Sequence, residues 1–104
     1  MKIIIEFWLL CEDGRTMFPG MKEDLMRQLD SIGQKPIIFG PPKAPSDLMA
    51  IISYLVEVPE LDDEKSQAKK AAEKIEDKII SVLHAENVIV YDVKYITNPD
   101  SPVM

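Results

Sequence analysis

The sequence predicts one α+β domain in which four strands and two helices follow in the order β-α-β-β-α-β. Alternating or β-branched apolar segments indicate the strands, and two segments with apolar residues every three or four positions indicate the helices. With 104 residues, 46% of them hydrophobic, the chain is long enough for one core. We expect this domain to span residues 1–97, followed by a flexible C-terminal tail at 98–104, which lacks a packing pattern.

The first strand is predicted at residues 2–11, a short run of β-branched and aromatic side chains. Successive side chains of a strand point to opposite faces, so one face here is wholly apolar. That face carries Ile3, Ile5, Phe7, Leu9 and Cys11. The other face combines two charged residues with Ile4, Trp8 and Leu10. This distribution favours a central position in the sheet.

The first helix is predicted at residues 21–32, and a glycine follows it. Its apolar residues recur at helical spacing: Met21, Leu25, Leu29 and Ile32. Residues 36–40 predict a short edge strand, since Pro36 has no N–H to donate to a neighbouring strand.

Residues 48–58 are ambiguous between a strand and a helix capped by Ser46 or Asp47. Their β-branched and aromatic content favours a strand, because a helix here would be apolar on nearly all sides.

The last two elements, a helix and a strand, have clearer patterns. A long helix is predicted from 63 to about 85, with a buried stripe formed by Ala68, Ala72, Ile75, Ile79, Val82 and Leu83. A final edge strand at 88–97 should place Ile89, Tyr91, Val93 and Tyr95 on one face.

This order of elements resembles the split β-α-β arrangement called ferredoxin-like, a four-stranded antiparallel sheet with two helices on one face. The resemblance lies in element order, and no family motif accompanies it. Because many unrelated functions occur on this fold, it predicts an architecture and not an activity.

Charge and cysteine content restrict the partners and the compartment. Twelve Lys and Arg residues against 18 Asp and Glu give a net charge of −6, which repels phosphate backbones, so we expect no nucleic-acid partner. Glu6 interrupts the first apolar run, which we interpret as a buried strand and not as a targeting or membrane segment. Cys11 is the only cysteine, so no intrachain disulfide can form, and we expect a cytoplasmic protein.

The predicted topology brings the only cysteine and the only histidine to the same end of the sheet. Cys11 ends the first strand, and His84 lies in the last turn of the long helix. One hypothesis makes Cys11 a nucleophile and His84 its base, with Asp13 or Glu12 orienting the imidazole and Arg15 holding an anionic substrate. The alternative is a small buried apolar side chain and a histidine that satisfies helix-end carbonyls.

Two other patterns carry little weight. A metal site would need Glu12, Asp13, His84 and Glu86 to converge, but none of them shows paired ligand spacing, and we expect no metal and no other cofactor. The segment Pro42-Lys43-Ala44-Pro45 matches a PxxP ligand, but we interpret its prolines as residues that stiffen a long loop.

The main functional prediction concerns the face of the sheet without helices. It should carry Ile4, Trp8 and Leu10, next to one of two alternating sets from the third strand: either Met49, Ile51 and Leu55, or Ala50, Ile52, Tyr54 and Val56. Such an apolar patch rarely stays bare on a monomer, and tryptophan is enriched at binding hot spots. We therefore predict a non-catalytic binding or assembly module. A second copy of the chain or a protein partner would cover the apolar face of its sheet.

Three alternatives remain open at this point. A small apolar ligand can cover the patch, or the C-terminal tail can lie over Trp8 through Val103 and Met104. The third alternative is a small thiol-dependent or anion-handling enzyme with its site near Cys11 and His84. If residues 48–58 were a helix, the arguments for both sites would fail together.

Overall fold

The computed structural model describes residues 2–15, 21–40, 48–58 and 64–97. Their elements are β1 (Lys2–Cys11), α1 (Lys22–Ser31), β2 (Ile38–Gly40), β3 (Met49–Glu57), α2 (Glu64–Ala85) and β4 (Val88–Thr97). The α+β class is confirmed, and the ambiguous segment is a strand. The tail at 98–104 and the PxxP segment lie outside the described residues, so the predictions made for them stay predictions.

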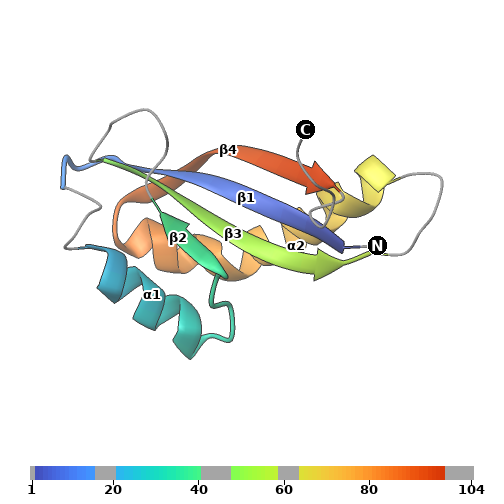
Figure 1. Cartoon of the computed structure of the whole chain (residues 1–104). Coiled ribbons are helices and arrows are strands. Elements are labelled where there is room, and N and C mark those ends of the chain that lie inside the picture. The colour runs from blue at the N-terminus through green and yellow to red at the C-terminus, as the bar shows by residue number, and fades with distance from the viewer. Residues whose placement is uncertain (1, 16–20, 41–47, 59–63, 98–104) are drawn as a thin grey trace.

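The four strands form one antiparallel sheet in the order β2-β3-β1-β4. β1 is central, as predicted, because it pairs with β3 on one side and β4 on the other. Figure 1 shows α1 and α2 on the same face of this sheet, with α2 running beneath the long strands. Neither of the two helices in the described residues lies on the opposite face.

The core lies between the sheet and the two helices. The predicted apolar face of β1, from Ile3 to Cys11, is at most 2% exposed. Residues paired across strands point to the same side, so Ile52 and Tyr54 of β3 also face the helices, and both are buried. The Phe7 ring meets the Tyr54 ring edge-on, with 5.8 Å between centroids. Of the two alternating sets considered for β3, Ala50, Ile52, Tyr54 and Val56 therefore face the helices.

The end of α1 explains one wrong prediction. Ile32 is 42% exposed, because the helix ends one residue earlier at Ser31. Gly33 takes a left-handed φ of +74°, and its N–H donates to the Asp30 carbonyl. Gln34 N–H donates to the Leu29 carbonyl at 2.8 Å, which completes a Schellman cap and turns the chain away from the helix.

The faces of β4 also differ from the prediction. A bulge opposite the Trp8–Leu9 step leaves Tyr91 without a pairing partner. An inserted residue reverses the alternation, so Val88 and Val90 face the helices while Ile89 points to the other side. The prediction that Ile89 shares a face with Val93 and Tyr95 was therefore wrong.

The long helix α2 buries four residues of the predicted stripe, Ala68, Ala72, Ile79 and Leu83, to at most 4% exposure. The other two, Ile75 and Val82, are partly buried against the same core. None of the helices in the described residues is both long and apolar enough to cross a bilayer.

Candidate functional site

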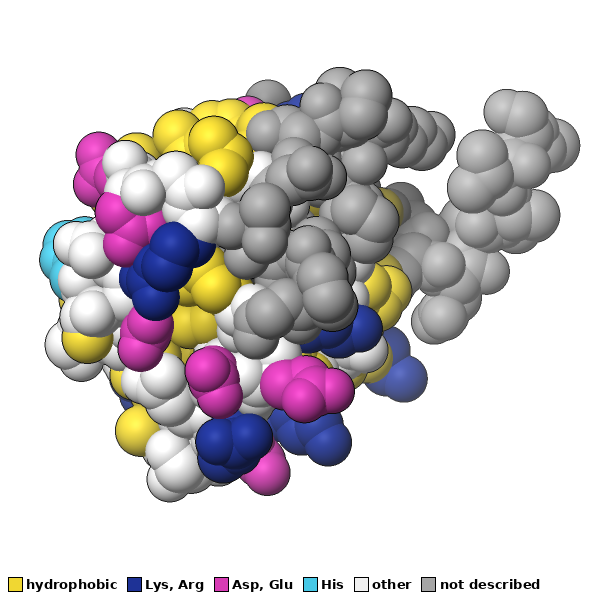
Figure 2. All heavy atoms as spheres, turned by 90° about the vertical axis from the view of Figure 1, so that its left-hand side faces the viewer, with side chains coloured by type: hydrophobic (Ala, Val, Ile, Leu, Met, Phe, Trp, Pro, Cys, Tyr) yellow, Lys and Arg dark blue, Asp and Glu magenta, His cyan; other side chains and the backbone are white. Residues whose placement is uncertain are grey.

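Two turns meet at one end of the sheet, one at residues 12–15 after β1 and the other at 86–87 before β4. The two strands are antiparallel neighbours, so the end of β1 lies beside the start of β4. The Glu12 N–H donates to the Asn87 carbonyl at 2.8 Å, and Asn87 has the left-handed φ (+57°) that asparagine tolerates in turns. Figure 2 shows this end of the molecule, where acidic and basic side chains lie next to one another.

Arg15 connects these two turns. Its Nε donates to both carboxylate oxygens of Asp13, at 3.0 and 2.8 Å. Its Nη2 donates to the Glu86 carbonyl at 2.6 Å, and its Nη1 to the Glu86 carboxylate at 3.2 Å. Gln28 of α1 donates to the other oxygen of that carboxylate at 3.3 Å. The guanidinium thus ties the two turns together, Glu86 joins them to α1 through Gln28, and the guanidinium nitrogens are engaged by the protein itself.

Cys11 belongs to the same network. Its thiol donates to Asp13 Oδ1 at 2.9 Å, and the residue is 2% exposed. His84 is exposed, and within the described part of the chain its imidazole makes no hydrogen bond; only its carbonyl accepts one, from Asn87 N–H. Of the predicted site residues, the structure joins Cys11, Asp13 and Arg15, and it does not join the His84 imidazole to them.

The electrostatics of this end are dominated by Asp13. The Arg15 guanidinium, and then the Cys11 thiol, hold the pKa of the Asp13 carboxyl well below its usual range. Asn87 donates a further hydrogen bond to it at 3.1 Å. In return, Asp13 raises the pKa of Arg15. Asp13, Arg15 and Glu86 thus form an ion-pair network in which the charged groups are hydrogen-bonded to one another.

Acid titration should reveal the role of Asp13. Because its folded-state pKa is lowered, the ionised carboxylate contributes stability that is present above about pH 4 and is lost as the pH falls below it. We expect the difference in urea midpoint between the wild type and Asp13→Asn to shrink from about pH 6 to about pH 3. Asp24→Asn is the control, since Asp24 pairs with Arg27 on the exposed surface of α1. A difference independent of pH would contradict this role.

No three His, Cys, Asp or Glu side chains of the described residues are placed to hold a metal ion. Glu86 is joined to Asp13 through the Arg15 guanidinium, and Asn87 donates a hydrogen bond to Asp13 directly. The sequence prediction missed Asn87 and Gln28 as members of this network and considered Glu86 only as a metal ligand. Their proximity depends on how the turns meet, and no local spacing in the sequence encodes it.

The second candidate site is the sheet face opposite the helices, called the open face below. It consists of Ile4, Glu6, Trp8 and Leu10 of β1, Ile38 of β2, Met49, Ile51, Ser53 and Leu55 of β3, and Ile89, Asp92, Lys94 and Ile96 of β4. Ile38, Leu55 and Ile96 are 54%, 46% and 41% exposed. The predicted residues Ile4, Trp8 and Leu10 are half-buried among them.

Trp8 lies on the open face between Ile51 of β3 and Asp92 of β4. The Tyr91 ring meets it edge-on at 6.2 Å, and Lys94 Nζ lies 4.1 Å from its ring centroid, a cation–π contact. Its Nε1 is buried without a hydrogen-bond partner in the described structure. The indole is therefore held between side chains of β4. The bulge that brings Tyr91 to Trp8 could not be predicted from the alternation of apolar and polar residues along β4.

The chain matches no protein-family model, no curated protein and no solved structure.

Proposed function

We propose that the protein is a non-catalytic assembly module that forms a homodimer through the open face of its sheet. The observation that carries the proposal is the exposure of Leu55 and Ile96, which flank the half-buried Ile4, and of Ile38. Trp8 and Ile51 lie half-buried further along the same face, beyond the row of Ser53, Glu6 and Lys94. Apolar patches that extend over several strands are usually covered by a partner. Two-fold association of identical chains is the commonest form of oligomer, and it covers both patches at once.

The charges on the open face support pairing with a second copy. The chain is acidic overall, with a net charge of −6, and this charge disfavours association of identical copies. The open face, however, has Lys94 paired across strands with Glu6, and Asp92 close by on the same strand. A patch that carries both signs can face itself across a two-fold axis, since the acidic groups of one copy can meet the basic groups of the other.

The proposal takes the fold to be ferredoxin-like. In the order β2-β3-β1-β4, β3 separates β1 from β2, and β1 separates β3 from β4. Each strand–helix–strand unit thus has a strand of the other unit inserted into it, which supports the split arrangement. Both described helices lie on one face (Figure 1), so neither of them covers the face that the proposal assigns to a partner.

The turn network gives less support to a thiol-dependent or anion-handling enzyme. A nucleophile needs access to its substrate and a base within hydrogen-bond reach. Cys11 is 2% exposed and donates to Asp13, while Arg15 is engaged by Asp13 and Glu86. The location is a separate part of the proposal. Because the sequence has a single cysteine and so no intrachain disulfide, it is compatible with a reducing compartment, and we propose that the module is cytoplasmic.

The solution mass tests the proposal directly. Size exclusion with light scattering, from about 100 μM down to about 1 μM, should give twice the chain mass of 11.8 kDa at the upper end. Cys11→Ser should keep this mass, because Cys11 faces the helices and not the open face. A single-chain mass at every concentration would contradict the homodimer and would favour the tail or another partner as the cover of Trp8.

A further inference from the structure

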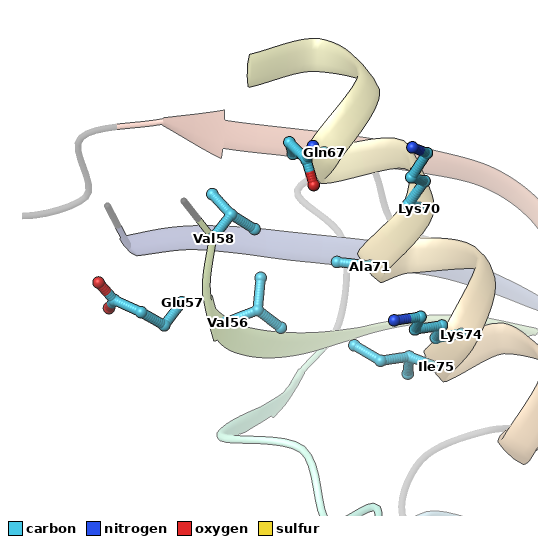
Figure 3. Close-up of a pocket in the computed structure, with 8 residues that line it drawn as sticks. All are labelled: Val56, Glu57, Val58, Gln67, Lys70, Ala71, Lys74 and Ile75. Carbon is cyan, nitrogen blue, oxygen red and sulfur yellow. The ribbon is translucent and has the colours of Figure 1, made fainter. Parts of the chain in front are cut away.

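A hollow of about 350 Å³ lies on the helix side of the sheet, between the end of β3 and the first half of α2. Figure 3 shows its apolar floor, formed by Val56 and Val58 of the strand end and by Ala71 and Ile75 of the helix. Its volume is at the lower end of the range found for small-molecule sites. It is on the side of the sheet away from the open face, so it is independent of the proposed dimer.

The sequence of α2 explains why this space exists. The helix residues packed toward the sheet are alanines in the first half, at 68, 71 and 72, and larger side chains in the second half, such as Ile79 and Leu83. Protein interiors are normally filled to high density. The short alanine side chains leave space near the end of β3 that isoleucine and leucine fill further along the helix.

The edge of the hollow on α2 is basic. Lys70 and Lys74 are four residues apart, so they are neighbours on one side of the helix. Both are exposed, and within the described residues neither lies within 4.0 Å of a carboxylate. Glu57 also borders the hollow, but strand alternation directs it to the opposite face from Val56 and Val58, and Figure 3 shows its carboxylate turned away from α2.

We propose that this hollow binds a small amphiphilic anion, an aliphatic carboxylate. The hydrocarbon chain would contact Val56, Val58 and Ile75, and the carboxylate would lie between the ammonium groups of Lys70 and Lys74. An apolar floor with two like charges at its rim favours this ligand over a purely apolar or a purely charged one. The volume corresponds to roughly a dozen water molecules, which accommodates a carboxylate of about ten non-hydrogen atoms.

Octanoate is the probe, titrated into the full chain by calorimetry and followed by NMR shifts of the Ala71 methyl group. We expect saturable binding with a Kd below about 1 mM. In the series butanoate, hexanoate and octanoate, affinity should rise about two- to fourfold for each added methylene, because each one buries apolar area. Octanol should bind about tenfold more weakly than octanoate, since it cannot pair with the lysines. Equal affinity across the series would contradict an apolar floor.

Two variants locate the ligand. Ala71→Leu fills the hollow, so it should remove octanoate binding while the thermal midpoint stays equal or rises. Lys70→Gln with Lys74→Gln should weaken octanoate about tenfold and leave octanol unchanged. The matched control, Lys69→Gln with Lys78→Gln, removes the same charge from exposed positions of α2 outside the lining and should bind like the wild type.

The outcomes separate this proposal from the dimer. Octanoate binding that survives in Ala71→Leu, or that never saturates, would overturn the site. Binding that is lost in Ile51→Glu, on the open face, and retained in Ala71→Leu would place the ligand on the wrong side of the sheet and would overturn it equally. A monomeric wild type that binds octanoate in the expected series would leave this site standing while the proposed dimer fails.

Discussion

Phe7→Ala is expected to lower the free energy of unfolding by about 3–5 kcal/mol, the range measured for phenylalanine truncations in cores. The Phe7 side chain is fully buried at the centre of β1, where β3 and β4 flank it on both sides. Its ring also packs edge-on against Tyr54. A domain of this size is stable by only about 5–15 kcal/mol, so the variant should unfold at a much lower urea concentration.

Two controls make this prediction specific. Phe7→Leu keeps most of the volume and should cost less than about 1.5 kcal/mol. Ile37→Ala removes an aliphatic side chain that is 57% exposed, and it should change stability by no more than about 0.5 kcal/mol. All proteins must be compared at one concentration, because association would add to apparent stability. Similar losses for Phe7→Ala and Ile37→Ala would contradict the core described above.

The parts of the fold that the sequence predicted are those with a local periodic pattern. β1 begins and ends at the predicted residues because five alternate apolar side chains specify which face is buried. The segment at 48–58 is a strand because its β-branched residues alternate between the core and the open face. Both patterns depend on a few consecutive residues, so they can be recognised without knowing the neighbouring elements.

The structural features that could not be predicted from the sequence depend on pairing between distant segments. The bulge in β4 is a property of its register with β1, and it determines that Tyr91 contacts Trp8. At the other site, Asp13 was predicted to orient the His84 imidazole and Arg15 to hold an anionic substrate, whereas in the structure the two side chains form an ion pair with each other. Their partners Glu86 and Gln28 come from a second turn and from α1, which only the assembled fold brings within reach.

Ile51→Glu is expected to abolish the proposed dimer and to raise its Kd at least about 100-fold. Ile51 pairs with Trp8 in the middle of the open face and is half-buried in the single chain. A carboxylate enclosed in an apolar interface without a partner costs several kcal/mol. Two-fold symmetry places the substitution in the interface twice, so the cost is incurred in both copies. Light scattering should give the mass of one chain at about 100 μM.

The matched control is Ile37→Glu, the same chemical change at an exposed aliphatic residue outside the open face. It should keep the mass of two chains. Circular dichroism should show that both variants are folded, because Ile51 is only half-buried and no core side chain changes. The fluorescence of Trp8 should move toward longer wavelength in Ile51→Glu, since loss of the second copy exposes the indole to water. A folded Ile51→Glu protein that keeps the mass of two chains would place the interface elsewhere on the molecule.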